Sequence, residues 1–168
     1  LMSSFLVIPI MLKQFGVAVE DHAGYYLCIL LGSFVLMLPL VIRWRGSADL
    51  LVKILPAIAV MVVGFLVLAW SPTLMLFVIA LLVFFVGFNY LEATLPTLVS
   101  KVAPSARRGS AMGVYSSSQF LGIFAGGSVG GVLIGLTDIT TLLVVNAALL
   151  ILWAGLLMAL QRGSNQPK

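Results

Sequence analysis

Charge is the scarcest property of this 168-residue chain, which has nine lysines and arginines and five aspartates and glutamates. Charged residues make up 8% of the sequence and hydrophobic residues 62%, whereas soluble domains average about 25% and about 45–50%. So few charges cannot cover a surface in water, and we expect a lipid bilayer to surround most of the chain. The net charge of +4 does not indicate nucleic-acid binding, because the basic residues are sparse and are not gathered on one soluble face.

Cysteine and histidine are equally scarce, with one residue of each. Cys28 lies within an apolar run, so no internal disulfide framework is possible. His22 stands in a polar stretch without the companions that a metal site requires. We therefore expect no bound metal and no cofactor.

Motifs of several functional classes are also missing. The sequence has no GxxxxGK(S/T) phosphate loop and no TVGYG ion filter. The serines at 116–118 have no histidine, lysine or aspartate within the apolar runs to activate a nucleophile. These absences predict a protein that is not an enzyme.

Six continuous apolar runs are separated by the charges: Leu1–Leu12, Ala23–Ile42, Ile54–Trp70, Leu74–Val99, Ala111–Leu136 and Thr141–Leu160. The last five are long enough to cross about 30 Å of hydrocarbon, which takes about 20 helical residues. The first is shorter, and we interpret it as the end of a truncated helix. Continuous runs favour helices over a barrel, whose strands alternate. The sequence thus predicts an all-α integral membrane bundle over 1–160 and a polar tail over 161–168.

The basic residues predict which side of the membrane each loop occupies. They gather in residues 43–53, 100–110 and 161–168, whereas the loops between have little or no positive charge. Cytoplasmic loops carry an excess of lysine and arginine. We therefore expect a multi-pass protein whose basic loops and C-terminus lie in the cytoplasm.

Glu92 is the one ionisable residue among Asp, Glu, Lys, Arg and His that falls inside a predicted span. A carboxylate at that depth is costly and marks a candidate functional residue. Asn89 and Pro96 share its helical face, and Pro96 removes a backbone donor that would kink or loosen the helix. Burial in apolar surroundings would raise the pKa of Glu92 towards neutrality.

The fifth run offers partners for Glu92 at the same depth. Its polar cluster spans 115–119, and antiparallel spans bring that cluster level with Glu92. We expect Glu92 to form a hydrogen bond here, through Gln119 or Tyr115. Two roles remain open: a carboxylate that carries the coupled proton, or a polar contact that ties two helices together.

The same run is rich in glycine. Gly122, Gly126 and Gly130 form one row four residues apart, and Gly127, Gly131 and Gly135 form the neighbouring row. Rows of small residues let helix backbones approach closely in lipid. They predict a helix-packing face, which serves either as static packing or as a surface that moves against its partner.

The segment 89–131, NYLEATLPTLVSKVAPSARRGSAMGVYSSSQFLGIFAGGSVGG, resembles the tenth and eleventh helices of the major facilitator superfamily. The likeness is to the drug/proton antiporter branch and its YajR-like bacterial transporters. Gly122, Gly126, Gly130 and Gly131 match the antiporter motif GxxxGPxxGG, with Gly127 at the proline position. SFVLMLPLVI, residues 33–42, also resembles the eighth helix of this family.

This resemblance implies that the chain is the six-helix C-terminal half of a twelve-helix fold, from the end of helix seven to helix twelve. The missing N-terminal half would then be a partner, and it would supply the helix that covers the glycine face. The implied activity is proton-coupled efflux of small molecules across a bacterial inner membrane by alternating access. The alternative is a self-contained six-helix membrane protein that acts as a structural or homodimeric partner.

Overall fold

The computed structural model describes residues 2–44 and 49–164. Within these residues the regular elements are helical, and the predicted all-α architecture is confirmed. The α-helices are α1 (Met2–Gln14), α2 (His22–Trp44), α3 (Leu50–Ala69), α4 (Leu74–Val102), α5 (Arg108–Leu136) and α6 (Ile139–Ser164). Short 3₁₀ turns, η1 (Val19–Asp21) and η2 (Ser105–Arg107), precede α2 and α5.

In the described chain, α2 to α6 are long and apolar enough to cross a membrane, and α1 is a shorter apolar helix. The helices extend beyond the apolar runs. Lys53, assigned from the sequence to a loop, lies in the first turn of α3, and Lys101 lies in the last turn of α4. A lysine near a helix end can keep its ammonium at the interface while its stem covers apolar surface, so these charges do not interrupt the spans.

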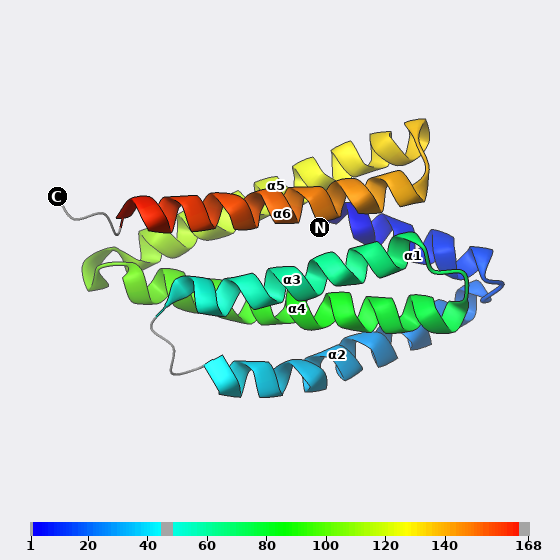
Figure 1. Ribbon diagram of the computed structural model, residues 1–168, viewed down its shortest axis with the longest axis horizontal. Helices are drawn as coiled ribbons and strands as arrows, with labels where there is room; N and C mark the ends of the chain where they lie inside the picture. The colour runs from blue at the N-terminus through cyan, green and yellow to red at the C-terminus, as the bar shows by residue number, and fades with distance from the viewer. Residues whose placement is uncertain (1, 45–48, 165–168) are drawn as a thin grey trace.

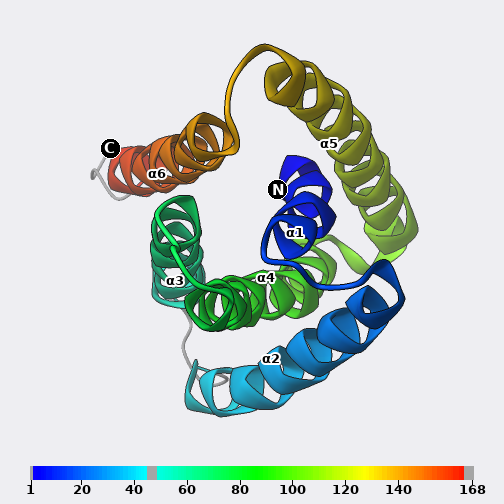
Figure 2. The same cartoon turned by 90° about the vertical axis from the view of Figure 1, so that its right-hand side faces the viewer.

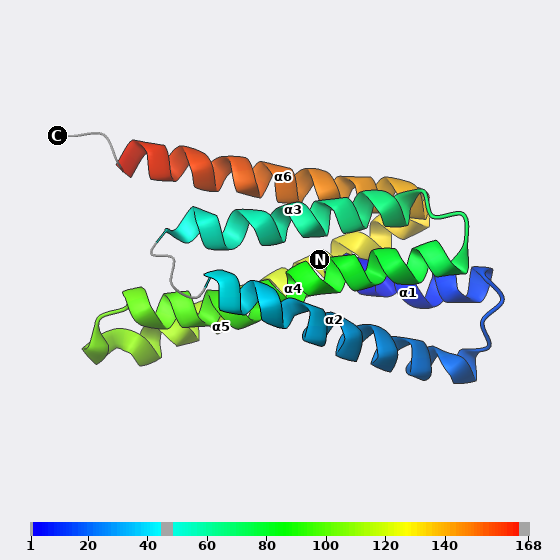
Figure 3. The same ribbon diagram turned by 60° about the horizontal axis from the view of Figure 1, so that its bottom comes forward.

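Four helices lie in the order α6, α3, α4, α2 (Figures 1 and 3), and each packs against the next. Seen along the bundle, α1 lies inside the arrangement and α5 lies at its edge (Figure 2). The principal contact of α5 is with α1, and it has smaller contacts with α4 and α6. The core therefore forms around α3 and α4, and α5 leaves most of its surface open.

The tightest packing joins α3 to α4 and depends on two glycines. A Cβ on Gly64 would lie 2.8 Å from the Cβ of Phe84, and one on Gly87 would lie 2.6 Å from the carbonyl oxygen of Ala57. The rings of Phe65 and Phe84, 4.7 Å apart, fill the space beside this contact. These glycines let two backbones meet, which is how helices associate in lipid.

Two aspartates stabilise helix ends at the membrane surface. Asp49 accepts a hydrogen bond from the backbone of Leu51 at 2.8 Å and another from Gln161 at 3.0 Å, so it joins the start of α3 to the end of α6. Asp138 accepts from the backbone and hydroxyl of Thr141 at the start of α6. These hydrogen bonds hold the pKa of each carboxyl below its ordinary value.

Substituting Gly87→Ala tests the contact between α3 and α4. The added methyl meets the backbone oxygen of Ala57, which cannot move without shifting the helix. We expect the free energy of unfolding to fall by about 1–3 kcal/mol, the usual cost of overpacking. Gly155→Ala is the control, because a Cβ there meets nothing within 4 Å and alanine favours helix. Equal unfolding free energies for the two variants, measured by chemical denaturation in detergent, would contradict the packing role.

Candidate functional site

Glu92 on α4 and Gln119 on α5 form a two-point contact. The Gln119 side-chain nitrogen lies 3.0 Å from one carboxylate oxygen of Glu92 and 2.9 Å from the other. At about 1.5 Å per residue, Glu92 lies about 15 Å from the end of α4 and Gln119 about 17 Å from the start of α5. The antiparallel helices thus bring the two side chains together well inside the span.

A cavity of ≈ 420 Å³ opens beside this pair. It is lined by residues of α1, α4 and α5: Phe5, Phe88, Glu92, Ser118, Gln119, Gly122 and Ile123. Its walls are largely apolar, and the carboxylate and amide form one polar spot. Small-molecule sites usually have this character and measure about 300–1,000 Å³.

The side chain of Glu92 is exposed on the surface of these six helices. The physical reason is the sparse packing of α5, whose one fully buried residue in the described chain is Gly130. The cavity consequently faces the open side of the bundle. The surroundings of Glu92 on that side lie outside these six helices.

Pro96 lies within α4, which continues without a break to Val102. A proline has no N–H, so Pro96 cannot donate to the carbonyl four residues earlier, which belongs to Glu92 itself. Pro9 in α1 has the same effect on the carbonyl of Phe5, which lines the same cavity. The two prolines thus weaken the backbone ladder beside the cavity. Pro96 was expected from the sequence to loosen its helix, whereas Pro9 was not recognised.

Asn89 does not join the pair formed by Glu92 and Gln119. Its side-chain nitrogen donates to the hydroxyl of Ser33 on α2 at 3.0 Å, and that hydroxyl donates to the carbonyl of Leu30 at 2.9 Å. Ser33 is completely buried. The polar residues predicted as one site are therefore divided between two helix contacts, and Ser33 was missed although it is a polar residue within an apolar run.

Tyr115 lies on α5 one turn before Gln119. It is half-buried and near enough to Glu92 for the two groups to interact electrostatically. The direct hydrogen bonds to Glu92 in the described structure come from Gln119. Tyr115 therefore adds to the surroundings of the carboxylate and does not hold it in place.

The glycine face borders the same cavity. Gly130 is buried within the chain and Gly126 is half-buried. A Cβ added at Gly122, Gly127, Gly131 or Gly135 would meet nothing within 4 Å. Most of the face is thus open in this structure, and an added side chain at these four glycines would meet no described residue.

His22 and Cys28 are the potential metal ligands that the sequence analysis set aside. His22 is buried at the start of α2, and its Nε2 lies 3.3 Å from the carbonyl of Val17. Cys28 is exposed on α2. No group of three or more His, Cys, Asp or Glu side chains forms a metal-binding cluster in the parts of the chain that are described.

The amino-acid sequence is similar to those of known membrane transporters. The sequence model of the family described as Major Facilitator Superfamily matches residues 1–127. "Inner membrane transport protein YajR" of Escherichia coli (strain K12) is 36% identical over 155 residues, which cover 91% of this chain and 34% of that protein. An "Uncharacterized transporter" of Buchnera aphidicola subsp. Baizongia pistaciae is 30% identical over 157 residues, or 91% of this chain and 40% of that protein. The chain thus spans well under half the length of these curated relatives.

A double-mutant cycle on Glu92→Ala and Gln119→Ala measures whether the pair stabilises the contact between α4 and α5. Side-chain hydrogen bonds inside membrane proteins contribute about 0.6 kcal/mol on average and up to about 1.7 kcal/mol. We expect a coupling free energy in this range from unfolding in detergent. Thr97→Ala with Gln119→Ala is the control pair, because the Thr97 hydroxyl donates to Ala93 in its own helix. Equal coupling in both cycles would show that the pair makes no specific contact.

Proposed function

This chain belongs to the Major Facilitator Superfamily, and we propose that it forms the C-terminal half of a proton-coupled transporter that exports small molecules. The observation that carries the proposal is the contact between Glu92 and Gln119 at a cavity in the membrane-spanning region. The whole protein would lie in the cell membrane with its C-terminus in the cytoplasm. Its two halves would rock about a substrate cavity between them, as alternating access requires.

Glu92 has the chemistry that a coupling group needs. When ionised, it accepts from the Gln119 amide at both oxygens. Protonation turns one oxygen into a donor, and Gln119 must then present its amide oxygen to keep two hydrogen bonds. Taking up a proton therefore rearranges the contact between α4 and α5. A proton that alters a helix contact can favour one orientation of the halves over the other.

The open glycine rows support the proposal that a further helix packs against α5 in the whole protein. Gly127, Gly131 and Gly135 leave space above the α5 backbone that no described residue fills. A helix from the N-terminal half could pack there closely, since small residues are what such contacts use. That half would also cover the exposed Glu92 and close the cavity.

Replacing Glu92→Gln in the full-length protein tests the coupling role. Glutamine keeps polar atoms for Gln119 but cannot bind and release a proton, so we expect transport driven by a pH gradient to fall at least about tenfold. Exchange of substrate without a gradient should persist. The assay follows proton release from inverted membrane vesicles upon adding a panel of lipophilic cations.

Glu20→Gln is the matched control for this experiment, because Glu20 lies in η1 between α1 and α2. It should leave gradient-driven transport unchanged. Unaltered proton dependence in Glu92→Gln would eliminate the coupling role and leave Glu92 as a static helix contact.

Gly131→Leu in the full-length protein tests the proposed interface between halves. A bulky side chain on the open face should obstruct the N-terminal half and reduce transport, while the unfolding free energy of the bundle changes little. Gly155→Leu is the control on α6, where a Cβ also meets nothing within 4 Å. Cross-linking between two copies through Gly131→Cys would favour the homodimeric partner instead.

A further inference from the structure

A second cavity lies at the end of the bundle where α2 ends and α3 begins. Its volume is ≈ 140 Å³, and nine residues line it: Val41, Trp44, Lys53, Tyr90, Ala93, Thr94, Thr97, Leu98 and Lys101. It lies on a different face of α4 from Glu92, which lines the other cavity. The roles proposed above for Glu92 and for the glycine face do not involve the residues that line this cavity.

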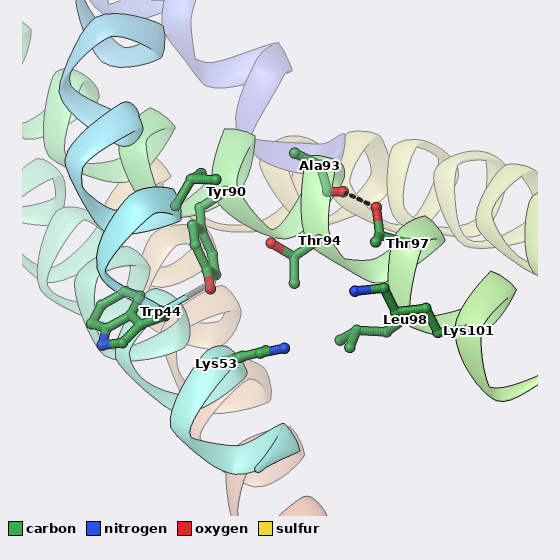
Figure 4. A pocket seen from close by; sticks show the side chains of 9 residues that line it. Trp44, Lys53, Tyr90, Ala93, Thr94, Thr97, Leu98 and Lys101 are labelled. Atoms are coloured by element: carbon green, nitrogen blue, oxygen red, sulfur yellow. Dashed lines mark hydrogen bonds between the residues drawn. The ribbon is translucent and has the colours of Figure 1, made fainter. Parts of the chain in front are cut away.

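Two positive charges converge on this cavity. Figure 4 shows the side chains of Lys53 and Lys101, from α3 and α4, pointing towards one another beneath Thr94. No acidic residue is among the nine that line the cavity. Like charges that face one another repel, and an anion between them would offset that repulsion. The arrangement is that of an anion site.

The other residues that line the cavity indicate which kind of anion would fit. Thr94 adds a hydroxyl, while Thr97 donates its own to the carbonyl of Ala93 (Figure 4). Trp44 and the buried Tyr90 form an edge-to-face wall with ring centroids 5.5 Å apart. Paired ammonium groups with a hydroxyl suit phosphate oxygens. The aromatic and aliphatic wall suits an apolar group attached to that phosphate.

The size of the cavity and its depth in the membrane also favour a phosphate that carries an apolar group. The cavity volume of ≈ 140 Å³ is below the range of about 300–1,000 Å³ that is usual for drug-sized molecules, and it suits a small group such as a phosphate. Lys101 lies in the last turn of α4, and Tyr90 lies about 18 Å before the end of that helix. The cavity thus extends from head-group level into the hydrocarbon layer. Trp44 is the last residue of α2. Tryptophan is enriched at the membrane–water interface, which is consistent with this end of the helix lying at head-group level.

We propose that this cavity binds the phosphate of an acidic phospholipid, with Lys53 and Lys101 on either side of it. Basic pockets between membrane helices on the cytoplasmic side are suited to such head groups. A bound lipid would join α2, α3 and α4 at this end of the bundle. The contact between Trp44 and Tyr90 would hold its wall in place.

Native mass spectrometry of the delipidated full-length protein tests this site with phosphatidylglycerol and phosphatidylcholine as probes. We expect phosphatidylglycerol to bind more tightly. Each lysine near an anionic lipid group increases the binding affinity about fivefold. The double variant Lys53→Gln with Lys101→Gln should therefore weaken phosphatidylglycerol binding about thirtyfold. Lys53→Arg with Lys101→Arg keeps both charges and should bind within about threefold of the unsubstituted protein.

Lys13→Gln is the matched control, because Lys13 lies near the end of α1 and does not line the cavity. It should leave phosphatidylglycerol binding unchanged, and thermal melting of every variant checks the fold. Equal loss of binding in Lys13→Gln, or equal affinity for the two lipids, would overturn the proposal. Inorganic phosphate forms the second arm: displacement of phosphatidylglycerol at micromolar phosphate would assign the site to free phosphate instead of a lipid.

Discussion

The hydrocarbon layer offers no hydrogen bonds, and the rest of this structure follows from that constraint. Backbone groups must be satisfied within each span, which is why the apolar runs become helices. Polar side chains must also find partners inside the protein. Gln119 reaches Glu92, Asn89 reaches Ser33, and the hydroxyl of Ser118 returns to the carbonyl of Val114 one turn earlier in its own helix. The few polar groups in the spans consequently determine which helices are tied together.

Helix α4 carries three different surfaces, and most of the chemistry of the chain is arranged around it. One surface holds Glu92 beside an open cavity. A second carries Tyr90 and Lys101 along the smaller basic cavity. A third meets α3 at Gly87 so closely that no side chain fits between the backbones. The close contact with α3 fixes the position of α4 and therefore the separation of the two cavities.

The sequence was informative where a property depends on local pattern and less so where it depends on which helices become neighbours. Run length and charge placement predicted the all-helical bundle. Equal depth in antiparallel spans suggested Gln119 for Glu92. Asn89 was grouped with Glu92 because residues three apart share a helical face, yet they differ by about 60° around the axis, enough for Asn89 to meet Ser33 on α2. Gly87 contacts α3, and Lys53 and Lys101 share one cavity, only because separate segments of the chain lie together in the fold. Local sequence spacing cannot predict such contacts.

The position of α1 has a consequence for synthesis. This helix packs chiefly against α5, yet α5 begins almost a hundred residues after α1 ends. At about 5–20 residues per second, about 5–20 s pass before the partner of α1 emerges. Meanwhile α3 and α4, which are neighbours in sequence, can already pack together. Among these six helices, α1 is therefore made before the others but enclosed by α5 late, and it must be held or shielded in the membrane during that interval.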